Sequence, residues 1–416
     1  MKKILALLLA GMMVFALAAC GTPAEPAPAE EETEATEAAE ATETAEATET
    51  AASGDTIVIG VYEPLSGDNG AGGKQETLGM QYANSITPTV DIGGTTYNVK
   101  LEIADNESSN DKAVSAASTL ISKGPSVILG SYGSGVSIAA SDTFGAAGIP
   151  AIGVTCTNPQ VTDGNSHYFR ICFLDPFQGT VLANFAKDEL GASTVYCLGQ
   201  LGNDYDQGLI NYFKQAAEGL GMTVITDSFP EGNSDFNSYL SNAKNQGAEV
   251  IFAPTSISYA QMIVDQAAAQ GISMPLLAGD TWDSNVVLAA TQGKDVQVYV
   301  TTFYAEGGDP DFETGFKDYI NNDSTAKANN GGDDMIAAVS VMGYDAYYVA
   351  LEALKVAGST DPAAVLAALP GVTYTGVSGE IAFNDIGDAI RDTAFVKQAN
   401  TTDNVWDFVK IQSVAE

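Results

Sequence analysis

Residues 131–135 (SYGSG) carry the groups best suited to hold an anion. They follow a short apolar stretch, 127–130, that is typical of a buried strand, and they lead into a helical stretch. Gly133 and Gly135 let the backbone turn and bring amide groups close to a ligand, and Ser134 adds a hydroxyl at the helix start. This combination fits a carboxylate. The structural alternative is that Ser134 only caps its helix.

Two further apolar stretches also end in polar residues. Thr155 and Thr157 follow residues 150–154, and Asp280 follows residues 275–278. Hydroxyls, main-chain groups and a carboxylate are the donors and acceptors that a zwitterion needs. Each of the three residues has a structural alternative as an N-cap of the helix or turn that comes next.

Other kinds of chemistry lack the residues they require. His167 is the single histidine, and four cysteines are too few for a His/Cys zinc site beside it. The sequence has no G-x-S-x-G motif and no G-x-G-x-x-G or P-loop motif. We therefore expect no catalytic residue, metal or cofactor, and we interpret His167 as structural. Cys197 is expected in a core, and a Cys156–Cys172 disulfide stays an open alternative.

These residues must be positioned by strands that alternate with helices from residue 55 onwards. Such alternation predicts parallel sheets joined by right-handed crossovers, an α/β fold with two doubly wound, Rossmann-like lobes. We predict strands at 56–61, 99–103, 127–130, 150–154, 194–198, 222–226, 250–253 and 275–278, and helices at 75–85, 111–123, 134–148, 176–190, 205–220, 235–246 and 258–270, with a Gly-rich loop at 66–73.

The last 114 residues are too many for a tail. They contain a predicted helix at 337–356 and strands near 379–383, 394–398 and 406–411. We expect them to be shared between the lobes, so that the chain crosses a hinge three times, near 172, 302 and 391. Lobe 1 is then 55–172 plus 303–391, and lobe 2 is 173–302 plus 392–416.

The N-terminus is a sorting signal. Lys2 and Lys3 precede an apolar run, 4–19, that is too short for a comfortable membrane span. The run ends in Leu-Ala-Ala-Cys, which resembles a bacterial lipobox in which Cys20 is lipidated. A plain secretory signal is the alternative. Residues 21–54 contain ten glutamates and no Lys or Arg, which indicates an acidic disordered tether after a 1–20 signal peptide.

Charge excludes several partners. The chain of 416 residues has 17 Lys and Arg against 53 Asp and Glu, a net charge of −36. Without the signal and tether the charge is still about −28, so acidity belongs to the whole folded surface. A nucleic acid or an anionic lipid surface requires a basic patch. We therefore expect neither, and membrane contact only through the lipid.

Eight short strings occur in order along residues 55–416: IG…PLSG (59–67), GSYGS (130–134), GIPAI (148–152), YFR (168–170), NDYDQG (203–208), DF (235–236), AGDTW (278–282) and GYDA (343–346). Together they resemble the type I periplasmic binding proteins, in particular the branched-chain amino-acid-binding proteins of ABC importers. The resemblance implies two lobes that close on a small ligand and present the closed form to membrane permeases.

The resemblance also assigns roles in the site. Ser134 matches the residue that binds the ligand α-carboxylate, and Thr155 and Thr157 match groups that face the amino-acid head. Asp280 matches an acidic residue that accepts from the ligand ammonium, a bond worth about 1.5–3 kcal/mol in a dry cleft. Tyr205 matches a tyrosine that covers the ligand as the lobes close.

Two positions depart from the family. Gly72 and Ser256 stand where well-known members have aromatic residues. The side-chain pocket is therefore expected to be wider, unless Trp282, Tyr132 or Tyr304 refills the space. This departure leaves room for a ligand larger or more polar than Leu, Ile or Val.

We thus expect an extracytoplasmic lipoprotein, a monomer on the outer face of the cytoplasmic membrane, that captures a branched-chain or other hydrophobic amino acid for an ABC importer. The alternatives are the same fold binding a small amide or an organic or aromatic acid, and a sensor component. A secreted amidase is the third class, but the sequence offers no triad, metal set or cofactor loop for it.

Replacement of Cys20 tests the membrane anchor. A Cys20→Ala variant should move from the membrane fraction to the soluble fraction, because one acylated cysteine is the only expected attachment. Cell fractionation followed by immunoblotting measures this. A Thr22→Ala variant serves as the control, and equal partitioning of the Cys20→Ala variant and the wild type would rule out a lipid anchor.

Overall fold

The computed structural model describes residues 55–413. The predicted signal peptide, Cys20 and the tether lie outside the described residues. Within residues 55–413, no helix is both long enough and apolar enough to cross a membrane.

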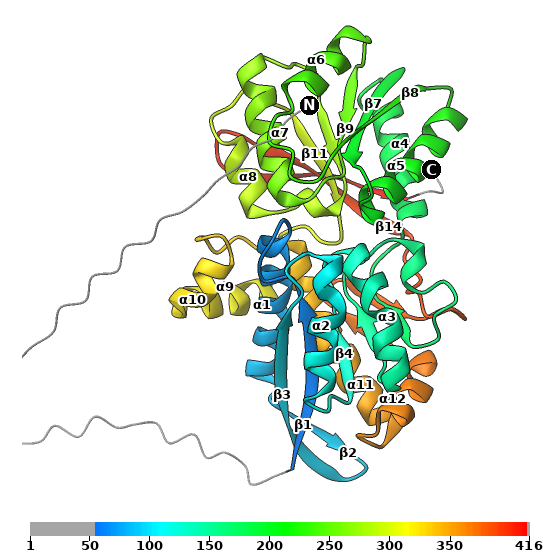
Figure 1. Ribbon diagram of the computed structural model, residues 1–416. Coiled ribbons are helices and arrows are strands. Elements are labelled where there is room, and N and C mark those ends of the chain that lie inside the picture. The colour runs from blue at the N-terminus through cyan, green and yellow to red at the C-terminus, as the bar shows by residue number, and fades with distance from the viewer. Residues whose placement is uncertain (1–54, 414–416) are drawn as a thin grey trace, which may run out of the picture. The chain divides into compact units, whose positions relative to one another are not determined.

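The first of two large sheets has six strands in the order β2-β3-β1-β4-β5-β6, and Figure 1 shows four of these strands, β1 to β4, in blue and cyan. All neighbours in it are parallel except the pair β2 and β3. Lobe 1 here denotes this sheet and the helices packed on it. Its strands are β1 (Thr56–Glu63), β2 (Thr89–Ile92), β3 (Thr95–Asp105), β4 (Val127–Leu129), β5 (Ala151–Gly153) and β6 (Tyr168–Arg170). Its helices are α1 (Gly70–Ile86), α2 (Asn110–Ile121), α3 (Ser134–Ala147), α9 (Pro310–Asn322), α10 (Ser324–Asn329), α11 (Ala338–Ala357) and α12 (Pro362–Ala368).

The second sheet has seven strands in the order β15-β14-β11-β10-β9-β7-β8. Lobe 2 denotes this sheet and its helices. Its strands are β7 (Thr194–Gln200), β8 (Thr223–Phe229), β9 (Val250–Phe252), β10 (Leu276–Ala278), β11 (Val298–Thr302), β14 (Thr393–Asn400) and β15 (Val405–Ser413). Its helices are α4 (Asp175–Asp188), α5 (Asp204–Gly219), α6 (Asn237–Asn245), α7 (Ile257–Gln270) and α8 (Asn285–Thr291). A separate hairpin pairs β12 (Thr373–Gly376) with β13 (Gly379–Ala382).

The chain visits the two sheets in turn. It leaves the first sheet after β6, builds β7 to β11, returns to lobe 1 with α9 to α12, and ends with β14 and β15 in the second sheet. Figure 1 shows β14, in red, among the green strands of lobe 2. The predicted class of two doubly wound α/β lobes is confirmed. The predicted lobe bounds, with crossings near 172, 302 and 391, stay a prediction.

Helices cover both faces of each sheet because side chains alternate along a strand. On β1, Ile57, Ile59 and Val61 belong to the core cluster shared with α1 and α11. Tyr62, on the opposite face, belongs to the cluster shared with α2 and α3. Lobe 2 has the same layering, with α6, α7 and α8 in one cluster and α4 and α5 in the other.

One predicted loop is partly helix. Residues 66–73 were expected to form a Gly-rich loop, but α1 begins at Gly70. A Cβ at Gly73 would collide with the carbonyl of Pro64, and a Cβ at Gly72 with the ring of Tyr132. These glycines therefore permit close packing inside a helix, and their low intrinsic helix propensity is overridden by tertiary contacts. The structure also contains elements that the sequence did not predict: β2, β6, β11, β12, α8, α9, α10 and α12.

Two glycines let α1 and α11 touch through their backbones. A Cβ at Gly79 would collide with the carbonyl of Ser340, and a Cβ at Gly343 with the carbonyl of Glu76. The Ser340 hydroxyl donates to the carbonyl of Gln75 at 2.7 Å across the same contact. The C-terminal part of the chain is thereby fixed to the first helix.

A Gly343→Ala substitution should destabilise the protein, because the added methyl group meets backbone that cannot move without shifting a whole helix. Overpacking of this kind costs about 1–3 kcal/mol or more. Thermal unfolding followed by circular dichroism measures the loss. The control is Gly219→Ala in α5, where a Cβ meets nothing within 4 Å. A Gly343→Ala variant as stable as this control would show that the two helices do not pack closely.

Candidate functional site

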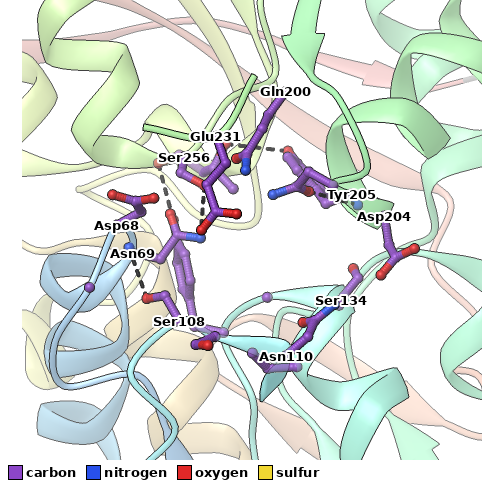
Figure 2. A pocket seen from close by; sticks show the side chains of 18 of the residues that line it. Asp68, Asn69, Ser108, Asn110, Ser134, Gln200, Asp204, Tyr205, Glu231 and Ser256 are labelled. Atoms are coloured by element: carbon purple, nitrogen blue, oxygen red, sulfur yellow. Dashed lines mark hydrogen bonds between the residues drawn. The ribbon is translucent and has the colours of Figure 1, made fainter. Parts of the chain in front are cut away.

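A cavity of about 360 Å³ lies where strand ends of both lobes converge. Every segment that lines it comes at the carboxyl end of a strand: β1, β3, β4 and β5 in lobe 1, and β7, β8, β9 and β10 in lobe 2. Figure 2 shows polar side chains from these segments arranged around the opening. Doubly wound sheets place ligands at this edge.

The start of α3 forms one wall of the cavity. Gly133, with φ of 113°, is the N-cap, so Ser134 is the first helical residue and does not cap the helix. The Ser134 hydroxyl oxygen accepts from the backbone N–H of Asn158 at 3.1 Å. A serine hydroxyl can accept and donate at the same time, and that of Ser134 donates to no residue within 55–413, so its proton is available to a ligand.

Thr155 and Thr157 have different surroundings. Thr155 lines the cavity, but its hydroxyl already donates to Oε2 of Glu76. Thr157 is buried behind the wall and does not line the cavity, and its carbonyl accepts from the backbone N–H of Asp175. Burial raises the pKa of the Asp175 carboxyl to about 7. The structure thus brings Thr155, but not Thr157, to the cavity surface.

Asp280 forms the opposite wall. Its side chain is buried, and its Oδ1 accepts from the Tyr205 hydroxyl at 2.8 Å and from Nε2 of Gln178 at 2.8 Å. Burial raises the pKa of Asp280 to about 6, and the two donors oppose this shift. Asp280 is not an N-cap of α8, since Ser284 has that role. The carboxylate is therefore held in place by neighbours rather than used for helix capping.

Tyr132 takes up the space beside Gly72. Its ring lies where a Gly72 side chain would be, its hydroxyl donates to the carbonyl of Thr281 at 3.1 Å, and it lines the cavity. Trp282 is buried and donates Nε1 to the carbonyl of Thr255, away from the cavity surface. Tyr304 also does not line the cavity, and its hydroxyl donates to Glu313. Of the three aromatic candidates, only Tyr132 faces the cavity.

A buried pair of glutamates supports the lobe 1 wall. Glu63 accepts from the backbone N–H of Tyr132 at 2.6 Å, and Glu76 accepts from Thr155. Burial raises the pKa of both carboxyls, and the charge of Glu76 raises the pKa of Glu63 further. Two adjacent buried carboxyls cannot both ionise cheaply, so the pair retains a proton near neutral pH. The burial of this pair could not be predicted from the sequence, because a glutamate in a helix, such as Glu76, is usually on the exposed face.

The two lobes are connected at the mouth of the cavity by hydrogen bonds. Asn69 donates Nδ2 to Oγ of Ser256 at 3.2 Å, and Ser258 donates its hydroxyl to Asp68 at 2.7 Å. On the other side, Asn158 donates Nδ2 to the carbonyl of Asp204 at 2.8 Å. These contacts join loops that lie more than a hundred residues apart on one side and 46 residues apart on the other.

Several lining residues were not predicted, and they share one signal. Each of them follows the carboxyl end of a strand, a position from which candidates were predicted for only some of the strands. These residues are Asp68, Asn69, Ser108, Asn110, Asp204 and Glu231. Glu231 was not predicted to lie at a strand end, because the predicted strand ends at residue 226 whereas β8 ends at Phe229.

The described cysteines are buried and free. Cys156 and Cys172 do not form the disulfide that the sequence left open. Cys197 lies in a core cluster of lobe 2, as predicted. His167 is half-buried, lies next to Ser166, and does not line the cavity.

With the fold and cavity in place, comparison with known proteins identifies the class. Residues 56–403 match the model of a family described as periplasmic binding protein. The match covers most of the chain, so the chain belongs to the periplasmic binding protein family.

Particular relatives cover most of the folded part. The chain is 28% identical over 336 residues to "Leu/Ile/Val-binding protein homolog 1" of Brucella abortus, covering 80% of this chain and 87% of that protein. A leucine-binding protein of Thermotoga maritima superposes with a TM-score of 0.75 at 29% identity, covering 86% of this chain and 99% of that one. A solute-binding protein of R. palustris in complex with benzoate has a TM-score of 0.72 at 17% identity, covering 86% and 96%, which shows a shared fold alone.

The glutamate pair predicts a pH dependence of stability. The folded state holds protons that the unfolded chain releases at about pH 4.3, so stability should fall as pH rises from about 5 to about 8. Glu76→Gln removes the repulsion within the pair, and its melting temperature should fall less over this range. Thermal unfolding at a series of pH values measures the slopes.

An Asp142→Asn variant on the exposed side of α3 is the control, and its melting temperature should change with pH as that of the wild type does. If the melting temperature of the Glu76→Gln variant had the same pH dependence as that of the wild type, the two glutamates would not share a proton in the folded state.

Proposed function

We propose that the protein is the extracytoplasmic substrate-binding component of an ABC importer and captures an amino acid between its two lobes. The observation that carries the proposal is the pairing of a helix start on one wall with a buried, oriented carboxylate on the other. Ser134 and the amides of α3 provide donors for a carboxylate, and Asp280 provides an acceptor for an ammonium.

Tyr205 and Gln178 support this role of Asp280. Both donate to its Oδ1, so the carboxylate is fixed before a ligand arrives. A preorganised acceptor loses little side-chain entropy on binding and therefore gives a stronger contact. The relatives support the same chemistry, since one is a Leu/Ile/Val-binding protein homolog and another is a leucine-binding protein.

Closure of the lobes is the step that would complete the site. The cavity walls come from both lobes, so a ligand that contacts both favours the closed arrangement. The bonds of Asn69 and Asp68 to the start of α7 then act as a latch on the closed form. A closed form that differs from the open form is what a membrane permease recognises in this mechanism.

We further propose that Cys20 anchors the protein by lipid and that the folded part acts as a monomer without turnover. A second candidate ligand class is an aromatic or organic acid, because a neighbour of the same fold was solved with benzoate. Such a ligand would use the start of α3 and bring no positive charge to the carboxylate of Asp280. The buried carboxylate therefore favours a ligand with an amino group.

Substitution of Asp280 tests the proposal. Asp280→Asn should lower amino-acid affinity roughly ten- to a hundredfold, since it removes a charge-assisted bond of about 1.5–3 kcal/mol. Ser134→Ala should cost about 1 kcal/mol, or about fivefold, because the backbone amides remain. Isothermal titration calorimetry with amino acids and their des-amino analogues measures both effects.

Asp142→Asn serves as the control for a change of charge alone. If the des-amino acid bound as tightly as the amino acid, Asp280 would not be an ammonium acceptor. The ligand class would then move to organic acids.

A further inference from the structure

The charged side chains that line the cavity within the described residues are all acidic. Six acids line the cavity, and no Lys, Arg or His of the described chain is among the lining residues; the acids are Asp68, Glu107, Asp111, Asp204, Glu231 and Asp280. Asp280 is 2% exposed, Asp68 and Asp204 are half-buried, and the other three are exposed at the rim. The less exposed acids matter most, because water and salt screen the rim.

Within residues 55–413 none of the six acids has an ion-pair partner, and only Asp111 and Asp204, in the first turns of α2 and α5, are favoured by a helix dipole. The ion pairs found within residues 55–413 all involve other carboxylates. Asp280 accepts from Tyr205 and Gln178 through Oδ1, which leaves Oδ2 without a side-chain donor. A buried carboxylate that stays charged needs a partner, and the cavity is where that partner can come from.

Asp204 is a second acid of the wall whose charge a cationic ligand could neutralise. Its Oδ2 lies 3.1 Å from the position that a Cβ on Gly135 would occupy, at the start of α3. Figure 2 shows Asp204 next to Ser134. A ligand carboxylate bound at this helix start would lie beside Asp204, and two like charges in contact repel each other. A zwitterion offers one ammonium, which Asp280 takes, and nothing for Asp204.

We propose that the ligand is an amino acid whose side chain is also positively charged, of the lysine, ornithine or arginine kind. The inference rests on the proposed function, because it keeps the amino-acid head between Ser134 and Asp280. The side-chain cation lies among the acids of the cavity mouth, beside the half-buried Asp204 at the start of α5 and with the exposed Glu231, from the loop after β8, at the rim. The volume of about 360 Å³ lies in the range of small-molecule sites, about 300–1,000 Å³.

Calorimetry of the full-length protein with three probes tests this. L-lysine carries the head and the cation, L-norleucine has the same chain length without the cation, and cadaverine lacks the carboxylate. Lysine should bind at least about tenfold more tightly than norleucine, and its affinity should fall as salt is added.

A pair of charge-matched double variants separates the cavity from the net charge of −36. Asp204→Asn with Glu231→Gln should weaken lysine binding by at least about tenfold, whereas norleucine binding should not weaken, because the loss of Asp204 removes the repulsion of the ligand carboxylate. Asp142→Asn with Glu380→Gln removes two exposed charges that do not line the cavity and should leave lysine affinity unchanged.

The outcomes are distinguishable. Norleucine binding as tightly as lysine would overturn the charge inference and leave the proposed amino-acid function standing. Cadaverine binding as tightly as lysine would support the cationic site and overturn the amino-acid head. Equal losses in both double variants would mean that net charge and not the cavity attracts the ligand. Binding of none of the probes would overturn the charge inference, whereas the proposed function fails only if the calorimetry with other amino acids fails as well.

Discussion

The contact between α1 and α11 determines the geometry of the lobe 1 half of the site. Gly79 and Gly343 permit the two backbones to meet, and this fixes α1 against the rest of the lobe. Helix α1 in turn carries Glu76, which holds Thr155, and Gly72, which makes room for Tyr132. The loop before α1 carries the residues that bond to lobe 2 at the cavity mouth. A shift of this one helix would therefore move three separate parts of the cavity wall.

Electrostatics distinguishes this cavity from a simple apolar pocket. The acids at the mouth have no ion-pair partner within residues 55–413, while the pair Glu63 and Glu76 behind the wall retains a proton because burial and mutual repulsion raise the pKa of both carboxyls. Charge is thus concentrated where a ligand can meet it and suppressed where it cannot. The buried pair Arg170 and Asp388 shows the other solution to the same problem, in which a charge is matched within the protein at 2.5 Å.

Sequence reasoning recovered what depends on local pattern. The alternation of strands and helices predicted the fold class. The position after a strand pointed to Ser134, Thr155 and Asp280, and the family resemblance added Tyr205; all four line the cavity. It failed where the outcome depends on distant contacts. The glycines at the start of α1 were predicted to form a loop, because the contacts that require them are with residues outside their own stretch of sequence. The burial of Glu63 and Glu76 likewise leaves no local pattern in the sequence. Thr157 and Trp282 followed strands as well, but the side chains lie behind the wall, which strand ends alone cannot reveal.

The return of the chain to each lobe has a consequence for the order of folding. The hydrogen bond from Ser340 to Gln75 spans 265 residues, and β11 gains its antiparallel neighbour β14 only when residues 393–400 are available. Lobe 1 cannot be completed before α11 and α12 have been synthesised, and lobe 2 cannot be completed before β14 and β15 have been synthesised. Long-range pairing of this kind slows folding. A nascent chain of this architecture therefore exposes the unpaired edge of β11 until β14 has been made, which sets the minimum length that can fold into both lobes.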